Sequence, residues 1–240
     1  MKLGHKQMIR GLLLASAAAV VMTNAPARAA DLSAPLATPH GHEWDIAFGV
    51  TLTSDYISRG DTQTEGGAAI QPYAELTIND CFYVGYWGSN VSFAGTKGWE
   101  SDLSVGVRPK LGPVSFDFGY VRYLYTNSAS AEYGEAYAKA SFSPFNPVTI
   151  GAAVFVNPAN SDHYLELNGS VDLSHGFSAS AAVGSNTLGT TTTTPWNAGV
   201  SWAPQDWVKF DGRYYAGPTA NKFVAAVTFS TSAKTLGIFH

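Results

Sequence analysis

The sequence predicts an all-β fold, a transmembrane antiparallel up-and-down β-barrel of about twelve strands with short periplasmic turns and long extracellular loops. First, apolar residues occupy every second position in short runs between Trp44 and Ser230, which is the side-chain period of a β-strand. Second, the connections between these runs alternate between long and short. Third, charged residues make up 13% of the chain. That is about half the ~25% typical of a soluble domain, so the polar face suits a lumen better than bulk water.

The N-terminus has the pattern of a secretory signal peptide. Lys2, Lys6 and Arg10 precede an apolar stretch from Leu12 to Met22, and small residues around Ala29 provide a cleavage site. The alternative, a membrane anchor, needs an apolar stretch of ~20 residues, and this one is shorter. The expected organisation is a signal peptide (1–29), a periplasmic N-terminal tail (30–43), the β-barrel (44–230) and a C-terminal tail (231–240).

The first strand, 44–53, shows the alternation clearly, because Ile46, Phe48 and Val50 share one face. In the segment 82–89, aromatic residues stand at both odd and even positions, so the sequence does not show which of its faces points inward. An even number of strands places both termini on the side of the short turns. The further strands are expected at 70–78, 82–89, 100–108, 114–120, 135–142, 148–156, 164–173, 177–183, 196–202, 208–215 and 223–229. The long loops are expected at 54–67, 90–98, 126–131, 157–162, 185–195 and 216–221. The short turns are expected at 79–80, 109–113, 143–147, 174–176 and 203–207.

Aromatic residues cluster near the predicted strand ends and indicate two girdles at the membrane–water boundaries. The alternative is that they are ordinary core aromatics of a soluble sheet. Arg122 continues the lipid-facing parity, so it either snorkels towards lipopolysaccharide phosphates or marks a local change of register. The girdle residues are Trp44, Tyr120, Trp196, Trp202 and Trp207, together with Tyr123 and Tyr125.

In each predicted strand, the alternate positions that carry polar residues face the interior, and the charged residues at these positions are the candidate pore lining. Acids outnumber bases among them, and this favours cations or neutral solutes weakly, because charged rings set pore selectivity. Neutralising Glu100 and Asp102 is therefore expected to lower cation preference. The alternative is that the charges pair across a narrow interior and hold it closed. The predicted pore-lining residues are Asp45, Glu75, Glu100, Asp102, Arg108, Asp117, Glu135, Lys139, Glu166, Asp172, Lys209, Asp211 and Arg213.

An ordered set of motifs resembles the TorF family of porins. The set consists of Thr53-Ser54-Asp55-Tyr56-Ile57-Ser58-Arg59-Gly60 with Gln63-Thr64, then Gly85-Tyr86-Trp87-Gly88-Ser89-Asn90-Val91, Glu100-Ser101-Asp102-Leu103, Glu135-Ala136-Tyr137 and Tyr164-Leu165-Glu166-Leu167-Asn168. The resemblance implies a proteobacterial outer-membrane barrel that passes small solutes, with no settled substrate. One departure is that such barrels usually end on an aromatic residue, whereas this chain ends Ile238-Phe239-His240. Either Phe229 closes the barrel before an extra tail, or the last strand has another register.

Catalysis and metal binding have weak sequence support. Ser161-Asp162-His163 has the residue types of a nucleophilic site, but neighbouring residues point apart and no Gly-x-Ser-x-Gly elbow accompanies them. His40 and His42 form a His-x-His pair without further ligands nearby. Cys81 is the only cysteine and is interpreted as passive. The five threonines from Thr190 are interpreted as a surface loop that is solvated or binds a ligand or phage.

Together these features predict a porin-like channel in the cell outer membrane for passive diffusion of small solutes, without enzyme activity, cofactor or metal. The alternatives are a closed structural or adhesin-type barrel and, with less support, a barrel enzyme. The expected partners are outer-membrane lipid and lipopolysaccharide, small solutes, periplasmic chaperones and the barrel-assembly machinery. The net charge of −4 is too small to indicate nucleic acid as a partner. The sequence leaves the oligomeric state open.

Overall fold

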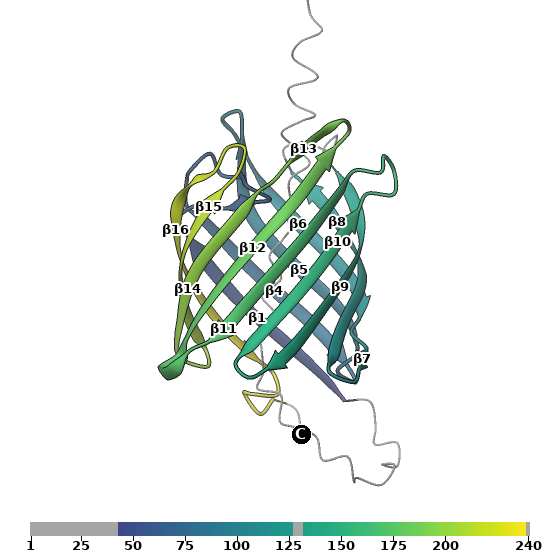
Figure 1. Ribbon diagram of the computed structural model, residues 1–240, viewed down its shortest axis with the longest axis vertical. Helices are drawn as coiled ribbons and strands as arrows, with labels where there is room; N and C mark the ends of the chain where they lie inside the picture. The colour runs from purple at the N-terminus through teal and green to yellow at the C-terminus, as the bar shows by residue number, and fades with distance from the viewer. Residues whose placement is uncertain (1–42, 127–131, 239–240) are drawn as a thin grey trace, which may run out of the picture.

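In the computed structural model, which describes residues 43–126 and 132–238, twelve long strands form a closed antiparallel barrel (Figure 1). The predicted fold class is therefore confirmed. No helix among these residues is long and apolar enough to cross a membrane. The long strands are β1 (Trp44–Thr53), β4 (Ala69–Ile78), β5 (Phe82–Phe93), β6 (Thr96–Val107), β8 (Val114–Tyr125), β9 (Tyr133–Phe145), β10 (Val148–Val156), β11 (His163–Asp172), β12 (Phe177–Leu188), β14 (Trp196–Gln205), β15 (Val208–Ala216) and β16 (Asn221–Ser232).

Four short strands and one short helix lie in the connections. They are β2 (Ile57–Ser58), β3 (Asp61–Thr62), β7 (Lys110–Leu111), β13 (Thr191–Thr193) and the 3₁₀ helix η2 (Ser174–Gly176). The short connections lie at the end of the barrel marked by β7 in Figure 1, here called the turn end, and the opposite end with β13 is the loop end. The predicted signal peptide, the His40 and His42 pair, and most of the predicted N-terminal tail and 126–131 loop fall outside the described residues.

The alternation of the sequence sorts side chains between the two faces of the barrel wall. On β6, Leu103, Val105 and Val107 are exposed on the outer face, whereas Glu100 and Asp102 are buried on the inner face. The same division runs through the other long strands, with large apolar residues outside and mostly small, polar or tyrosine residues inside. This arrangement is the reverse of a soluble barrel and matches a wall that faces lipid.

The barrel closes through pairing of the first and last long strands. β16 pairs with β1 over a continuous register that places Phe229 opposite Val50. β16 reaches Ser232, slightly beyond the predicted boundary, and the backbone N–H of Ala233 then donates to the carbonyl of Ile46. Phe229 therefore lies in the closing strand, and of the two alternatives for the C-terminus the first matches the structure.

Two predicted loops are largely strand. The segment 90–98 continues β5 and β6 as a hairpin whose tip is Ala94 and Gly95, so the predicted loop is wrong except at this tip. In the threonine run, Thr191–Thr193 pair with the end of β12 as a second projecting hairpin. The physical reason is that β-branched threonines favour extended backbone and that ladder hydrogen bonds continue beyond the barrel rim.

The structure also assigns positions that the alternation left ambiguous. On β5, Tyr83 and Ser89 are buried inside, and Val84 and Tyr86 are exposed outside. The register between β8 and β9 is continuous around Arg122, so no register change occurs there. Arg122 instead forms an exposed ion pair with Glu132 at 3.4 Å.

The five principal girdle aromatics are exposed on the outer face, namely Trp44, Tyr120, Trp196, Trp202 and Trp207. Several stack on outer-face neighbours, as Trp202 does on Phe177 and Phe210. Tyr123 and Tyr125 differ from the prediction, because they are buried inside the barrel. They follow Tyr120 by an odd number of residues, and this places them on the opposite face of β8.

Candidate functional site

The first long connection, residues 54–68, folds into the barrel and is here called the inward loop. It contains the small β2–β3 hairpin, in which Ile57 pairs with Thr62. Most of its residues between Asp55 and Thr64 are buried, although the composition is that of a solvated surface loop. Its contacts with several parts of the wall define the candidate site.

Arg59 attaches the inward loop to β9. Its guanidinium donates to both carboxylate oxygens of Glu135, at 2.9 and 2.7 Å, and both side chains are almost fully buried. Tyr123 donates a third hydrogen bond to Glu135 at 3.0 Å. Burial by itself lowers the pKa of Arg59, but the Glu135 carboxylate outweighs this and holds the pKa above its usual value. The guanidinium is therefore charged, and it lies over the ring of Tyr164 at 4.6 Å.

The tip of the inward loop reaches the wall near β14–β16. Gly60 has a φ of 81°, and a Cβ added there would lie 2.7 Å from Cβ of Pro195 and 2.8 Å from Cα of Gly217. The carbonyl of Gly60 accepts from the backbone N–H of Ala220 at 3.0 Å. Only glycine fits this position, because it needs both a left-handed backbone and no side chain.

Further contacts hold both arms of the inward loop. Lys222 of β16 donates to Asp55 at 2.8 Å, and Asp55 also accepts from Thr64 at 2.7 Å. On the other side, Ser92 of β5 donates to Glu65 at 2.6 Å. The loop is therefore attached to β5, β9 and β16, which lie at separate places around the barrel.

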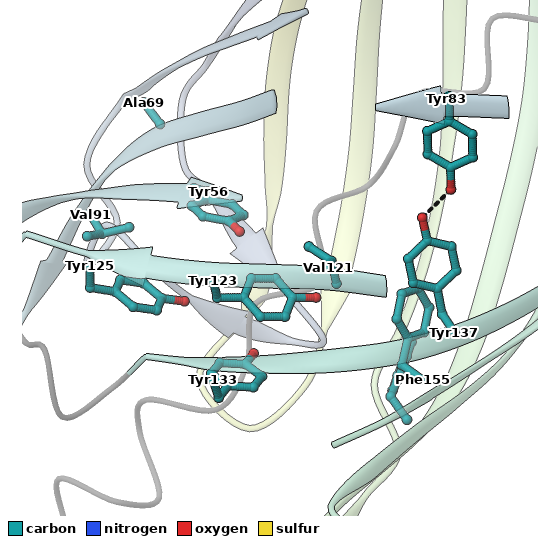
Figure 2. Close-up of a cluster of buried hydrophobic side chains, with 11 residues drawn as sticks. Tyr56, Ala69, Tyr83, Val91, Val121, Tyr123, Tyr125, Tyr133, Tyr137 and Phe155 are labelled. Carbon is teal, nitrogen blue, oxygen red and sulfur yellow. Dashed lines mark hydrogen bonds between the residues drawn. The ribbon is translucent and has the colours of Figure 1, made fainter. Parts of the chain in front are cut away.

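Beneath the inward loop, the inner faces of β5, β6, β8, β9, β10 and β11 carry large side chains and are here called the packed wall. Figure 2 shows this cluster, in which the hydroxyl groups of Tyr83 and Tyr137 face each other. Tyr56 of the inward loop belongs to the same cluster and contacts Trp87 edge-on, with ring centroids 5.3 Å apart. Tyr125 donates to Glu100 at 3.0 Å. Tyrosines thus fill this half of the interior, and Tyr123 and Tyr125 donate to two of its carboxylates.

Towards the turn end, the packed wall carries a network of alternating charges. Arg108 donates to Glu75 at 2.5 and 2.7 Å and lies 3.7 Å from Asp117. Lys139 approaches the same Asp117 carboxylate at 3.6 Å, and Tyr83 donates to it at 2.7 Å. Two acids and two bases therefore neutralise one another in this network.

The inner faces of β12, β14, β15, β16 and β1 carry smaller residues and are here called the open wall. Ser178 and Ser201 share a hydrogen bond at 2.8 Å, and Arg213 donates to Asn197 at 2.7 Å and Ser180 at 2.8 Å. Arg213 also pairs with Asp211 at 3.1 Å. These side chains are half-buried rather than sealed, so solvent reaches them.

The structure divides the predicted pore-lining residues into two groups. Four acids on the inner face are at most 3% exposed, namely Glu100, Asp102, Asp117 and Glu135. Tyrosines and the inward loop cover the acids near the loop end, whereas Asp117 is enclosed by its partners in the charge network. The sequence predicts that all four face the lumen, because alternation along a strand gives the face of a residue but not its burial by other side chains or loops. The residues that keep solvent contact are Asp45, Glu75, Arg108, Lys139, Glu166, Asp172, Lys209, Asp211 and Arg213.

Sequence reasoning assigned no site role to Asp55, Arg59 or Lys222, which attach the inward loop. The available signal was charge, since Asp55 and Arg59 stand within a long polar connection. That signal does not distinguish a solvated loop from one that folds inward, because the partners of both residues lie far away in the sequence.

The Ser161-Asp162-His163 segment has no catalytic arrangement in the described structure. His163 Nδ1 lies 3.1 Å from the backbone carbonyl of Ser161 rather than from its hydroxyl. The Asp162 carboxylate accepts from Asn160 and from the backbone N–H of Gly189, both at 2.7 Å. These contacts order the loop between β10 and β11 and join it to the β12–β13 hairpin.

Comparison with solved structures supports the same class of fold. A KdgM porin matches with a TM-score of 0.60 and 8% identity over 78% of this chain and 99% of that chain. A KdgM porin in complex with disordered oligogalacturonate matches with a TM-score of 0.58 and 8% identity over the same shares. A structure from a study of in-meso crystallization of membrane proteins matches with a TM-score of 0.54 and 10% identity, over 79% and 84% of the two chains.

The fold and the polar interior define a porin-like β-barrel. Among curated proteins none matches the chain. A family model matches residues 37–238, and the chain belongs to that family, Gcw_chp, described as bacterial proteins of unknown function. The narrower resemblance to TorF porins stays a prediction.

Proposed function

We propose that this protein is an outer-membrane channel for passive diffusion of small polar solutes. In this proposal the apolar outer face contacts outer-membrane lipid and lipopolysaccharide, and periplasmic chaperones and the barrel-assembly machinery deliver the chain. The porin neighbours support the proposal at the level of the fold. The oligogalacturonate in one of them belongs to that protein, and no solute is carried over from it.

The observation that carries the proposal is solvent access inside the barrel. The side chains of Arg108 and Glu75 are 30% and 21% exposed, although both lie on the inner face. On the opposite side, the inner-face pair Arg213 and Asp211 is 16% and 22% exposed. Exposure of inner-face side chains on both sides supports an interior that water enters, as the proposed channel requires.

Burial of four acids changes the expected selectivity. Acids outnumber bases nine to four among the predicted pore-lining residues. Once Glu100, Asp102, Asp117 and Glu135 are covered, five acids and four bases keep solvent contact. We therefore propose that cation preference is weak and that neutral polar solutes pass as readily as small ions.

Conductance measurements test this function. The purified barrel, with folding checked by a heat-modifiable gel shift, is inserted into planar bilayers under a salt gradient. Stepwise conductance with a small reversal potential is expected. Folded protein that inserts but gives no conductance steps would overturn the proposal and favour the closed structural barrel. The inward loop and the paired interior charges are the observations that support this alternative.

A further inference from the structure

We infer that the inward loop is the constriction of this channel, held at the loop end by Arg59 and Glu135, and that it sets the size limit for passing solutes. The inference rests on the proposed channel function and identifies the segment that controls it. Its basis is the position of the loop, which shares the interior with inner-face side chains instead of covering the rim.

The height of the loop in the barrel follows from the strand positions of its partners. Glu135 is near the start of β9, Phe155 near the end of β10 and Tyr164 near the start of β11, and these three strand ends lie at the loop end. Arg59 contacts all three, through the Glu135 ion pair and over the two rings at 5.3 and 4.6 Å. The loop therefore lies just inside the mouth.

The span of the loop follows from contacts on the far side. Gly60 packs on Pro195 and Gly217, which flank β14 and β15, and Asp61 accepts from Thr219 at 2.9 Å. The loop leaves the wall between β1 and β4 and contacts both the packed wall and the far rim. A solute that enters from the loop end must pass beside it, because the loop occupies part of the cross-section at this height.

The fixation of the loop indicates a defined constriction rather than a loose flap. The Arg59–Glu135 pair is bidentate and nearly sealed from solvent, and such pairs hold geometry more strictly than exposed ones. Gly60 adds a steric fit at the tip, and Lys222 and Ser92 hold the two arms. These attachments come from different strands, so the loop keeps one position relative to the lumen.

Shortening the loop is the direct test. Residues 56–66 are replaced by a short Gly/Ser linker together with Glu135→Gln, which avoids leaving an unpaired buried carboxylate. Single-channel conductance is expected to rise about twofold or more, because the narrowest section limits flow, and larger polyethylene glycols should enter the pore. The matched control deletes residues 190–193 from the projecting β12–β13 hairpin, and it should leave both readouts at the parent value.

A gentler pair of variants covers the case in which the shortened loop prevents folding. Gly60→Ala keeps every charge but forces the tip away from Pro195 and Gly217, whereas Gly95 has a similar φ of 76° with nothing within 4 Å of an added Cβ. Gly60→Ala is expected to give frequent transitions to a higher conductance level, and Gly95→Ala is not.

The outcomes separate this inference from the proposed function. A conducting parent whose shortened or Gly60→Ala variant shows unchanged conductance and unchanged polymer exclusion overturns the constriction and leaves the channel intact. A silent parent with a conducting shortened variant supports the constriction and shows that the parent is closed by it. If parent and variants are all folded and silent, both the channel and the constriction are overturned.

Discussion

The packed wall and the open wall are built on the same alternating strands, yet they differ in what their inner faces carry. The packed wall places tyrosines and carboxylates such as Tyr123 and Glu135 under the inward loop, where water is excluded. The open wall presents serine, asparagine and the solvent-accessible Arg213. The strands alternate in the same way in both halves, so the difference comes from the volume of the inner-face side chains together with the inward loop that packs on one of them.

The largest expected effect is on the packed wall. Glu135→Ala leaves Arg59 charged and buried without its partner, and removing one member of a buried pair costs about 3–5 kcal/mol. Urea unfolding in lipid vesicles measures the loss. Glu132→Ala, which breaks only the exposed pair with Arg122, is the control and should cost at most about 1 kcal/mol. Equal losses in the two variants would mean that the Arg59 pair does not hold the loop.

A smaller contrast compares one hydroxyl on each wall. Tyr83→Phe removes the hydroxyl that donates to buried Asp117 and bonds to Tyr137, and losing a buried hydrogen bond to a charged group costs about 1–3 kcal/mol. Ser178→Ala removes a hydroxyl bonded to Ser201 on the open wall, where water replaces it, so about 0.5 kcal/mol is expected. The same unfolding assay checks both, and a greater loss for Ser178→Ala would contradict the division into two walls.

The smallest effect concerns selectivity, measured as reversal potential under a salt gradient. Arg213→Gln removes a positive charge that solvent reaches on the inner face, and under the proposed function it should raise the cation-to-anion permeability ratio by a factor of about two. Glu100→Gln with Asp102→Asn should leave the ratio unchanged, because both side chains are covered. The sequence alone predicted a loss of cation preference for this double variant. A shift of that kind would show that the two acids reach the lumen after all.

Strand number and the inner and outer faces could be predicted because they depend on a local rule, the period of two. Leu103 and Val105 illustrate this, since their parity alone places them outside. The same rule was insufficient for β5, where Tyr83 and Tyr86 are similar residues on opposite faces. At Tyr123 and Tyr125 the alternation places both side chains inside, and the girdle prediction, which rests on residue type, is wrong there.

The inward loop could not be predicted, because nothing near it in the sequence indicates its partners. Glu135 is 76 residues from Arg59, and Lys222 is 167 residues from Asp55. Only the closed barrel brings these positions together. Polar composition between Ser54 and Gly67 indicates a loop equally well whether the loop lies outside or inside. For the same reason, the alternation places Glu100 and Asp102 on the inner face but does not predict that other side chains bury them there.

These long separations also bear on the order in which the molecule assembles. The inward loop lies between the first two long strands, yet Thr219 and Lys222 belong to the last part of the barrel, 158 and 167 residues from their partners. Contacts across such distances form late, because the intervening chain must be ordered first. We therefore expect the loop to dock only after β16 has joined β1. In an intermediate in which β1 and β16 are not yet paired, the inward loop would not occupy the loop end of the barrel. Docking of the loop would therefore be a sign that the barrel has closed.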